Sequence, residues 1–346
     1  MSFNAFSPNS SLTSYFSLFR ASNLLSYFPR MSILTVAPTE NIAGSAPHRT
    51  WSGRGFAWSA VIIGSRLPEI ICREFGFNAE VWLSPLSQTI ILVGLAMVAA
   101  KLCPIKNLAG FILAIAALTF SWRVLVPWIE ALSAFRSASQ YLGWGGRFFL
   151  LRAIRTTGAL LMIVTLIGSG IGRRELFLRL GNWHAPVQPE PFLWFRRPIP
   201  WTRFAVTLLL IFGVLLPVYL YLTLHPQIEG LHRVLLVLPW AVATSALNAA
   251  NEEFQFRSVL LARLRHIVPP GEAFLLTAAL FGISHYFGQP SGWGGVFMAG
   301  IAGWIWAKSM IETRGFACAF ASHFVQDMVI FCFLAMSATD LSSAWS

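Results

Sequence analysis

The stretch of sequence that organises the chain is Asn248-Ala249-Ala250-Asn251-Glu252-Glu253-Phe254-Gln255-Phe256-Arg257. It interrupts an apolar run over residues 231–264, so two adjacent carboxylates and a guanidinium lie where a membrane helix is normally apolar. An ionisable group at membrane depth costs roughly 3 to 10 kcal/mol, and such groups persist mainly when they are paired or serve a function. The stretch therefore predicts a functional site inside a membrane helix. The alternative is a buried ionic lock that performs no chemistry.

The spacing of these charged residues divides their roles. In a helix, Glu253 and Arg257 are at positions i and i+4 and share one face, with the glutamate in the favoured N-terminal position. Glu252 is rotated by about 100° from Glu253 and cannot share the same partner equally well. We interpret Glu253 and Arg257 as a structural ion pair and Glu252 as the free carboxylate.

The composition predicts the fold class. The chain of 346 residues is 56% hydrophobic and 11% charged, whereas a soluble domain carries roughly 25% charged residues. We expect an all-α fold, a polytopic transmembrane helical bundle with about eight membrane segments that lies in the lipid bilayer. The net charge of the chain is +11. In a membrane protein, an excess of basic residues usually means that basic loops face the cytoplasm or anionic lipid. We expect no nucleic-acid partner, because the sequence offers no basic soluble face.

The chain divides into four parts. Residues 1–50 are rich in Ser, Asn and Pro and predict a poorly ordered tail, with a transit peptide or a true start at Met31 as alternatives. Residues 51–171 hold the N-terminal transmembrane helices. Residues 172–203 contain six Arg and five Pro and form the main hydrophilic loop, which we place in the cytoplasm. Residues 204–338 carry the motifs described next.

Two of the expected membrane helices matter for the site. One spans residues 150–171, with Arg152 and Arg155 near its start. The other is a long tilted helix that starts near Pro239 and puts Glu252 near its middle, because the apolar run exceeds the ~20 residues of an ordinary crossing.

Two later apolar segments also carry ionisable groups. Phe281 and His285 are at i and i+4 of one segment, and His323 and Asp327 are at i and i+4 of another. Together with Glu252, they indicate a site that activates water. A carboxylate shielded from water is a good base near neutral pH, an imidazole can relay the proton, and a second imidazole with a carboxyl partner can hold an oxyanion.

Two other interpretations of these residues stay open. A single histidine in an apolar helix is more often a core residue than a catalyst. The set Glu252, His285 and His323 could also bind Zn²⁺ as two histidines and a carboxylate. We prefer a site without a cofactor, because the sequence contains no HExxH helix; it also lacks a GxSxG elbow and a phosphate-binding glycine loop.

The ordered triple of motifs resembles a known family. The motifs are Glu252-Glu253-x-x-x-Arg257, Phe281-x-x-x-His285 and His323-x-x-x-Asp327. Over about residues 235–335 the chain is similar to the CAAX protease and bacteriocin-processing (CPBP or Abi) family. That family includes type II CAAX prenyl endopeptidases and proteins like lysostaphin resistance protein A. The resemblance implies an all-helical intramembrane protease. Members of this family were long regarded as metalloproteases.

The resemblance also implies roles for the motif residues. Glu252 would be the general base on water, aided by His285. His323 and Asp327 would form the oxyanion side of the site. We expect a metal-independent glutamate mechanism rather than a metalloendopeptidase.

The remaining motif residues would support the site. These supporting residues are Glu253, Arg257 and Phe281. Two positions depart from the family pattern: Ser258 stands where a glycine commonly follows the arginine, and Asp327 stands where eukaryotic members tend to have Asn. Ser258 could crowd the helix packing, and Asp327 adds a charge or a proton near the oxyanion side.

The expected partner is a peptide or protein substrate, either a prenylated C-terminal peptide or a leader peptide. We place the protein as an integral membrane protein in the bacterial inner (plasma) membrane. The rival hypothesis is a non-enzymatic scaffold or bacteriocin-immunity protein that keeps the polar cluster for helix packing. A transporter is a third class, but no inverted repeat is visible. Convergence of Glu252, His285 and His323 on one cavity would favour the enzyme.

Overall fold

The computed structural model describes residues 51–77, 84–167, 169–190, 197–226, 228–264 and 267–338. The predicted N-terminal tail, residues 1–50, lies outside these described residues. Residues 47–346 form one compact unit, and the following description concerns that unit alone.

The described residues are mostly helical and contain only one short pair of strands, which confirms the all-α prediction. The first eight helices are α1 (Trp51–Gly64), α2 (Leu67–Glu74), α3 (Pro85–Lys101), α4 (Ala109–Phe120), α5 (Val126–Ala131), α6 (Ser133–Tyr141), α7 (Gly143–Ala153) and α8 (Thr156–Leu166). The remaining helices are α9 (Trp201–Leu210), α10 (Leu216–Leu224), α11 (Leu231–Glu253), α12 (Leu260–Leu264), α13 (Pro270–Ser284), α14 (Gly292–Thr313) and α15 (Ala317–Ser337). Between α8 and α9, the hydrophilic stretch holds a short antiparallel pair, β1 (Pro186–Val187) and β2 (Ile199–Pro200).

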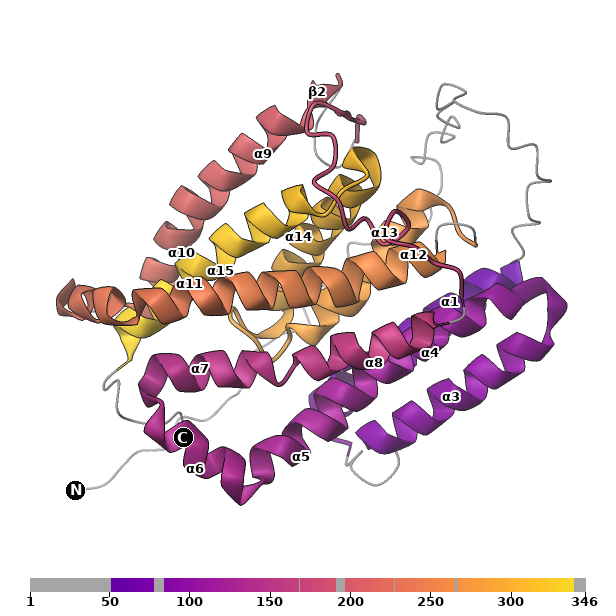
Figure 1. The fold of residues 1–346 in the computed structure, drawn as a ribbon, viewed down its shortest axis with the longest axis horizontal. Coiled ribbons are helices and arrows are strands. Elements are labelled where there is room, and N and C mark those ends of the chain that lie inside the picture. Colours follow the sequence, from indigo (N-terminus) through magenta and orange to yellow (C-terminus); the bar gives the residue numbers. More distant parts are fainter. Residues whose placement is uncertain are drawn as a thin grey trace, which may run out of the picture. The chain divides into compact units, whose positions relative to one another are not determined.

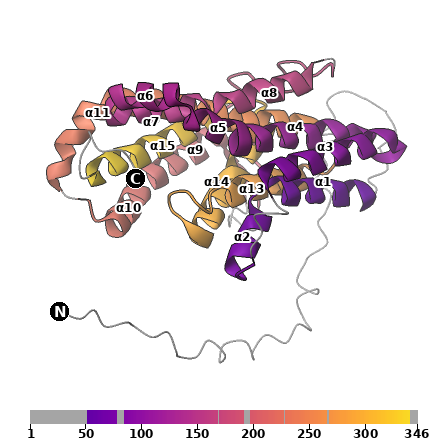
Figure 2. The same cartoon turned by 90° about the horizontal axis from the view of Figure 1, so that it is seen from below.

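Six helical segments of the described chain are long and apolar enough to cross a membrane. They are Ile105–Ala131, Gly143–Leu166, Trp201–Leu224, Leu231–Leu264, Gly292–Thr313 and Ala317–Ser337. The number is seven if α1 and α2, bent by 62° at their junction, count as one span. Helix α2 projects from the rest of the helices in Figure 2. The shorter apolar helices α3 and α13 account for the higher predicted number of about eight. The protein is an integral membrane protein with an all-helical fold.

The motif-bearing helix is longer than predicted. It begins at Leu231 and continues through Pro239, whereas a start near Pro239 was expected. A proline removes only one backbone hydrogen bond, and membrane helices tolerate this loss because neighbouring groups can satisfy the freed carbonyl. Directly after Glu253 the helix widens into a π-helical segment, Phe254–Val259, and then continues as α12. Such widened turns occur frequently at functional sites.

The helix expected over residues 150–171 is displaced towards the N-terminus. It comprises α7 and α8, which together span residues 143–166 with a break at Ile154 and Arg155. Gly143 has a φ of +62°, a conformation that favours glycine, and this turn separates α6 from α7. Helices α7 and α8 run alongside α11 in Figure 1. Arg152 and Arg155 therefore lie in the middle of a span, not near its start.

Close helix contacts bring the three motifs together. Helix α15 packs along α11, and α13 packs against α14 as an antiparallel pair. The α13–α14 contact depends on Gly282, where an added Cβ would lie 2.5 Å from the carbonyl oxygen of Val296. Small residues allow such close approach of helices in membranes. The C-terminal ends of α11 and α13 and the middle of α15, which carry the ionisable residues, thus surround one space.

Candidate active site

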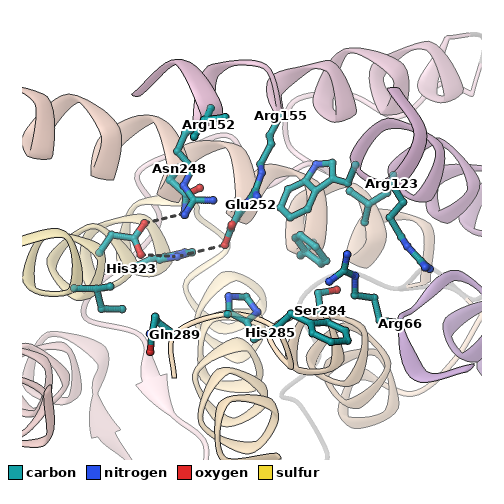
Figure 3. Close-up of a pocket in the computed structure, with 18 of the residues that line it drawn as sticks. Arg66, Arg123, Arg152, Arg155, Asn248, Glu252, Ser284, His285, Gln289 and His323 are labelled. Carbon is teal, nitrogen blue, oxygen red and sulfur yellow. Dashed lines mark hydrogen bonds and ion pairs between the residues drawn. The ribbon is translucent and has the colours of Figure 1, made fainter. Parts of the chain in front are cut away.

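The ionisable residues of the three motifs line one cavity of about 550 Å³. Glu252, His285, His323 and Asp327 all contribute to its wall. Figure 3 shows the first three of them. They come from α11, the C-terminal end of α13, and α15. The convergence that the sequence analysis set as the criterion for an enzyme is therefore present in the structure.

His323 occupies the centre of the polar cluster. Its Nδ1 lies 2.8 Å from Glu253 Oε1, and its Nε2 lies 3.6 Å from both Glu252 Oε2 and Asp327 Oδ1. The imidazole stacks on the indole of Trp306, with ring centroids 4.1 Å apart and planes 11° apart. Because an ionised carboxylate can only accept, Nδ1 carries the proton in its bond to Glu253. The ring is thus fixed in orientation and presents Nε2 to the two other carboxyl groups.

The predicted ion pair between Glu253 and Arg257 is confirmed. Arg257 Nη1 lies 3.0 Å from Glu253 Oε1, and both side chains are fully buried. The guanidinium lies over the Phe281 ring at 3.8 Å, which gives this third supporting residue a cation–π contact. An added Cβ at Gly303 would lie 2.6 Å from Arg257 Nη2, so α14 leaves the space that the guanidinium fills. Glu253 therefore holds both Arg257 and His323.

Among the three motif carboxylates, Glu252 is the one that has no hydrogen bond to a described residue. Its residue surface is 4% exposed, and Oε2 has no hydrogen-bond partner among the described residues. Its nearest contact is the 3.6 Å approach of His323 Nε2. A buried carboxylate without donors faces the cavity and is free to take a proton from water, which agrees with its interpretation as the free carboxylate.

His285 lies on the opposite side of the cavity from α7 and α8 (Figure 3). Its Nδ1 lies 2.8 Å from the carbonyl oxygen of Phe281, one helical turn earlier. A carbonyl accepts, so Nδ1 donates and Nε2 of the neutral ring is an acceptor. This bond fixes the tautomer, and His285 can receive a proton or orient a water at Nε2.

The structure assigns a contact to Asn248 that the sequence analysis did not identify. Asn248 Nδ2 donates to Asp327 Oδ2 at 2.9 Å, and both residues line the cavity. Asn248 precedes Glu252 by four residues, so both lie on one face of α11. The spacing of Asn248 and Glu252 could have indicated that Asn248 lies at the site. Its bond to Asp327 could not be predicted, because the sequence does not show where α15 packs.

Ser258, which stands where the resembled family commonly has a glycine, fits between the helices. The residue is fully buried, and its hydroxyl lies 3.9 Å from the sulfur of Met310 on α14.

The described residues do not fit a metal centre. Among them, no three His, Cys, Asp or Glu side chains are arranged to hold a metal ion. The set Glu252, His285 and His323 named above for Zn²⁺ therefore does not form a ligand group among the described residues.

The region that carries the motifs is similar to a known protein family. Residues 234–329 match the family model described as type II CAAX prenyl endopeptidase Rce1-like. The matched range contains all seven motif residues, and the resemblance predicted from the sequence is confirmed over it. No curated protein and no solved structure matches the chain. Arg152 and Arg155, which also line the cavity, lie outside the matched range.

Proposed function

We propose that the protein is an intramembrane endopeptidase that hydrolyses a peptide bond near the bilayer surface. The observation that carries this proposal is the convergence of Glu252, His285 and His323 on one cavity inside a helical membrane protein. A scaffold would need the ionisable groups to satisfy one another. Here the Glu252 carboxylate has no hydrogen-bond donor among the described residues, which is the state that a general base requires.

The first step of the proposed reaction is attack by water. Glu252 takes one proton as the water oxygen forms a bond to the scissile carbonyl carbon, and the carbonyl oxygen becomes an oxyanion. His285 orients the water through Nε2, the nitrogen left free by its bond to Phe281. In the second step the C–N bond breaks, and the amine that leaves takes its proton from Glu252. The products are a carboxylic acid and an amine, and Glu252 returns to its starting state. The acid then passes its proton to the amine or to water, which gives a carboxylate and an ammonium group.

We assign the oxyanion side to His323 and Asp327. When His323 carries a proton on both nitrogens, Nε2 becomes a charged donor while Nδ1 remains bonded to Glu253. A charged donor in a cavity shielded from water stabilises a developing oxyanion strongly. Asp327 Oδ1 lies 3.6 Å from the same Nε2, and the hydrogen bond from Asn248 holds the Asp327 side chain in place.

We assign a peptide or protein substrate. The match of residues 234–329 to the type II CAAX prenyl endopeptidase family favours substrates whose C-terminal region carries a prenyl group. A membrane-associated leader peptide is the alternative, and it fits a location in a bacterial inner membrane. The cavity wall also carries the apolar residues Phe148, Leu151, Ile330, Phe331 and Leu334, which suit an apolar segment of either substrate.

The test is a screen of the purified protein in proteoliposomes. A peptide library that contains prenylated C-terminal peptides, their unprenylated counterparts and leader peptides is incubated with the protein, and the products are identified by mass spectrometry. We expect cleavage of one class by the wild-type protein and none by Glu252→Gln. Equal cleavage by both proteins would refute the assigned base, and specific binding of a protein partner without cleavage of any peptide would support the scaffold.

A further inference from the structure

Arg152 and Arg155 lie on the cavity wall opposite His285 and have no role in the proposed peptide hydrolysis. Arg152 lies in the last turn of α7, and Arg155 lies in the break between α7 and α8. Both line the cavity, and Figure 3 shows them beside Asn248 and Glu252. Both are partly exposed, so a molecule in the cavity can contact them.

The other two arginines of the cavity differ from this pair because they have an acidic partner. Arg123 Nη2 lies 2.9 Å from Glu69 Oε2, and Arg66 Nε lies 3.8 Å from the same oxygen. Among the described residues, Arg152 and Arg155 have no ion pair and donate no side-chain hydrogen bond, and Arg152 Nε is buried without a partner. Glu130 and Glu252 line the same cavity, but neither lies within 4 Å of these guanidinium groups.

Each of the two guanidinium groups lies over an aromatic ring. Arg152 lies over the Phe148 ring at 5.0 Å, and Arg155 lies over the Trp122 ring at 5.1 Å. An aromatic ring beneath the guanidinium leaves the N–H groups at its edge available. Edge N–H groups of arginine form bidentate, charge-assisted hydrogen bonds with carboxylates.

The motif helix itself fixes the position of this pair. Gln255 Nε2 donates to the carbonyl oxygen of Arg155 at 3.2 Å and also donates to Asn251 on its own helix. The break between α7 and α8 is therefore tied to the π-helical segment that directly follows Glu253. A group bound by Arg152 and Arg155 would lie at a fixed position relative to Glu252.

From this geometry we infer that Arg152 and Arg155 form a subsite that binds a carboxylate of the substrate. The inference rests on the proposed hydrolysis, and it adds that the distance from the bound carboxylate to Glu252 determines which peptide bond is cut. The carboxylate has two sources, the C-terminus of the substrate or the side chain of an internal Asp or Glu. A merely structural role, in which the arginines offset the charges of Glu252 and Asp327, produces no preference for a carboxylate in the ligand.

The test measures binding separately from cleavage. The protein carries Glu252→Gln to prevent hydrolysis, and the probes are three fluorescein-labelled pools of apolar hexapeptides. One pool has a free C-terminal acid, the second has a C-terminal amide, and the third has the amide and one internal Glu. Fluorescence anisotropy in detergent gives the Kd of each pool. We expect the pool with the recognised carboxylate to bind about tenfold more tightly than the amide pool, as one charged hydrogen-bonded contact provides.

Substitutions of the two arginines test whether they cause the preference for a carboxylate. Arg152→Gln with Arg155→Gln is expected to abolish it, and the corresponding pair of lysine substitutions, which keeps the charge and loses the bidentate edge, is expected to retain part of it. Arg147→Gln is the matched control, because Arg147 lies on the same helix α7 and does not line the cavity. We expect this control to leave all three Kd values unchanged.

The outcomes separate this inference from the proposed function. Preference for the free acid identifies the C-terminus as the source, and preference for the internal Glu identifies a side chain. Absence of any preference in the parent protein, or a preference that survives the double glutamine variant, would overturn the subsite. Carboxylate-dependent binding together with no cleavage by the wild-type protein would refute the hydrolysis and leave the subsite standing. Cleavage by the wild-type protein without a carboxylate preference would refute the subsite and leave the hydrolysis standing.

Discussion

His323 Nδ1 lies 2.8 Å from Glu253 Oε1, so the second glutamate of the motif holds the imidazole whose other nitrogen faces the first. The adjacent glutamates therefore act on the same ring from two directions. Glu253 is fully buried and has two partners, His323 and Arg257. Glu252 remains without a hydrogen bond among the described residues and faces the cavity. Their different surroundings, and not their chemistry, separate the supporting carboxylate from the proposed base.

The buried pair of Glu253 and Arg257 is expected to stabilise the fold as a unit. Replacing one partner leaves an uncompensated buried charge, so Arg257→Met should lower the free energy of unfolding by about 3 to 5 kcal/mol. Glu253→Gln combined with Arg257→Met should cost clearly less than the sum of the two single substitutions. Denaturant unfolding in detergent micelles measures all three, and additive losses would show that the two side chains are not coupled.

The glycine that accommodates Arg257 is expected to be intolerant of a methyl group. Gly303→Ala would place Cβ 2.6 Å from Arg257 Nη2 and 3.0 Å from Phe281 Cδ1. Overpacking of this kind costs typically 1 to 3 kcal/mol, and displacement of Arg257 should also lower the rate of peptide cleavage. Gly294→Ala on the same helix is the matched control, because an added Cβ there meets nothing within 4 Å. Equal thermal stability of the two variants would contradict the assigned packing.

The hydrogen bond from Asn248 to Asp327 is expected to require an acceptor oxygen rather than a charge. Asp327→Asn keeps an oxygen that accepts from Asn248 Nδ2 and should retain most of the cleavage activity. Asp327→Ala removes that oxygen and leaves the buried Asn248 amide without its partner, which costs about 1 to 3 kcal/mol. Initial rates of cleavage by the two variants measure the difference. If the Asn variant is as inactive as the Ala variant, the negative charge of Asp327 is essential.

Chelation of metal ions is expected to leave the activity unchanged. No set of three metal-binding side chains exists among the described residues, and the derived reaction uses only protein groups and water. Cleavage rates measured before and after dialysis against a strong chelator test this. A rate that falls on dialysis and returns with added Zn²⁺ would show that a metal takes part.

The sequence predicts what depends on neighbours along one helix. The ion pair of Glu253 and Arg257 follows from their spacing, and the membrane class follows from composition. The bonds from His323 to Glu253 and from Asn248 to Asp327 join helices that are far apart in the chain, so helical spacing alone cannot reveal them. Only the packing of α15 on α11 produces these contacts.

The errors in helix boundaries have a similar cause. An apolar run does not show where a membrane helix begins, so the turn at Gly143 and the passage of α11 through Pro239 were missed. The first error had a functional consequence. It placed Arg152 and Arg155 near the start of a membrane helix, where basic residues are ordinary, whereas the structure places them in the middle of a span and in the wall of the cavity.

The central claim is that Glu252 activates the water that cleaves the peptide bond. The most direct measurement compares kcat for wild type, Glu252→Gln and Glu253→Gln in proteoliposomes, on the peptide that the wild-type protein cleaves best. The thermal unfolding of each variant is recorded in parallel. We predict that Glu252→Gln loses activity by a factor of about 10² to 10⁴, the usual contribution of a general base, while it unfolds at the wild-type temperature. Glu253→Gln should instead lower the unfolding temperature, because it loses a buried partner of Arg257 and His323. A folded Glu252→Gln protein that cleaves at the wild-type rate would contradict the assignment.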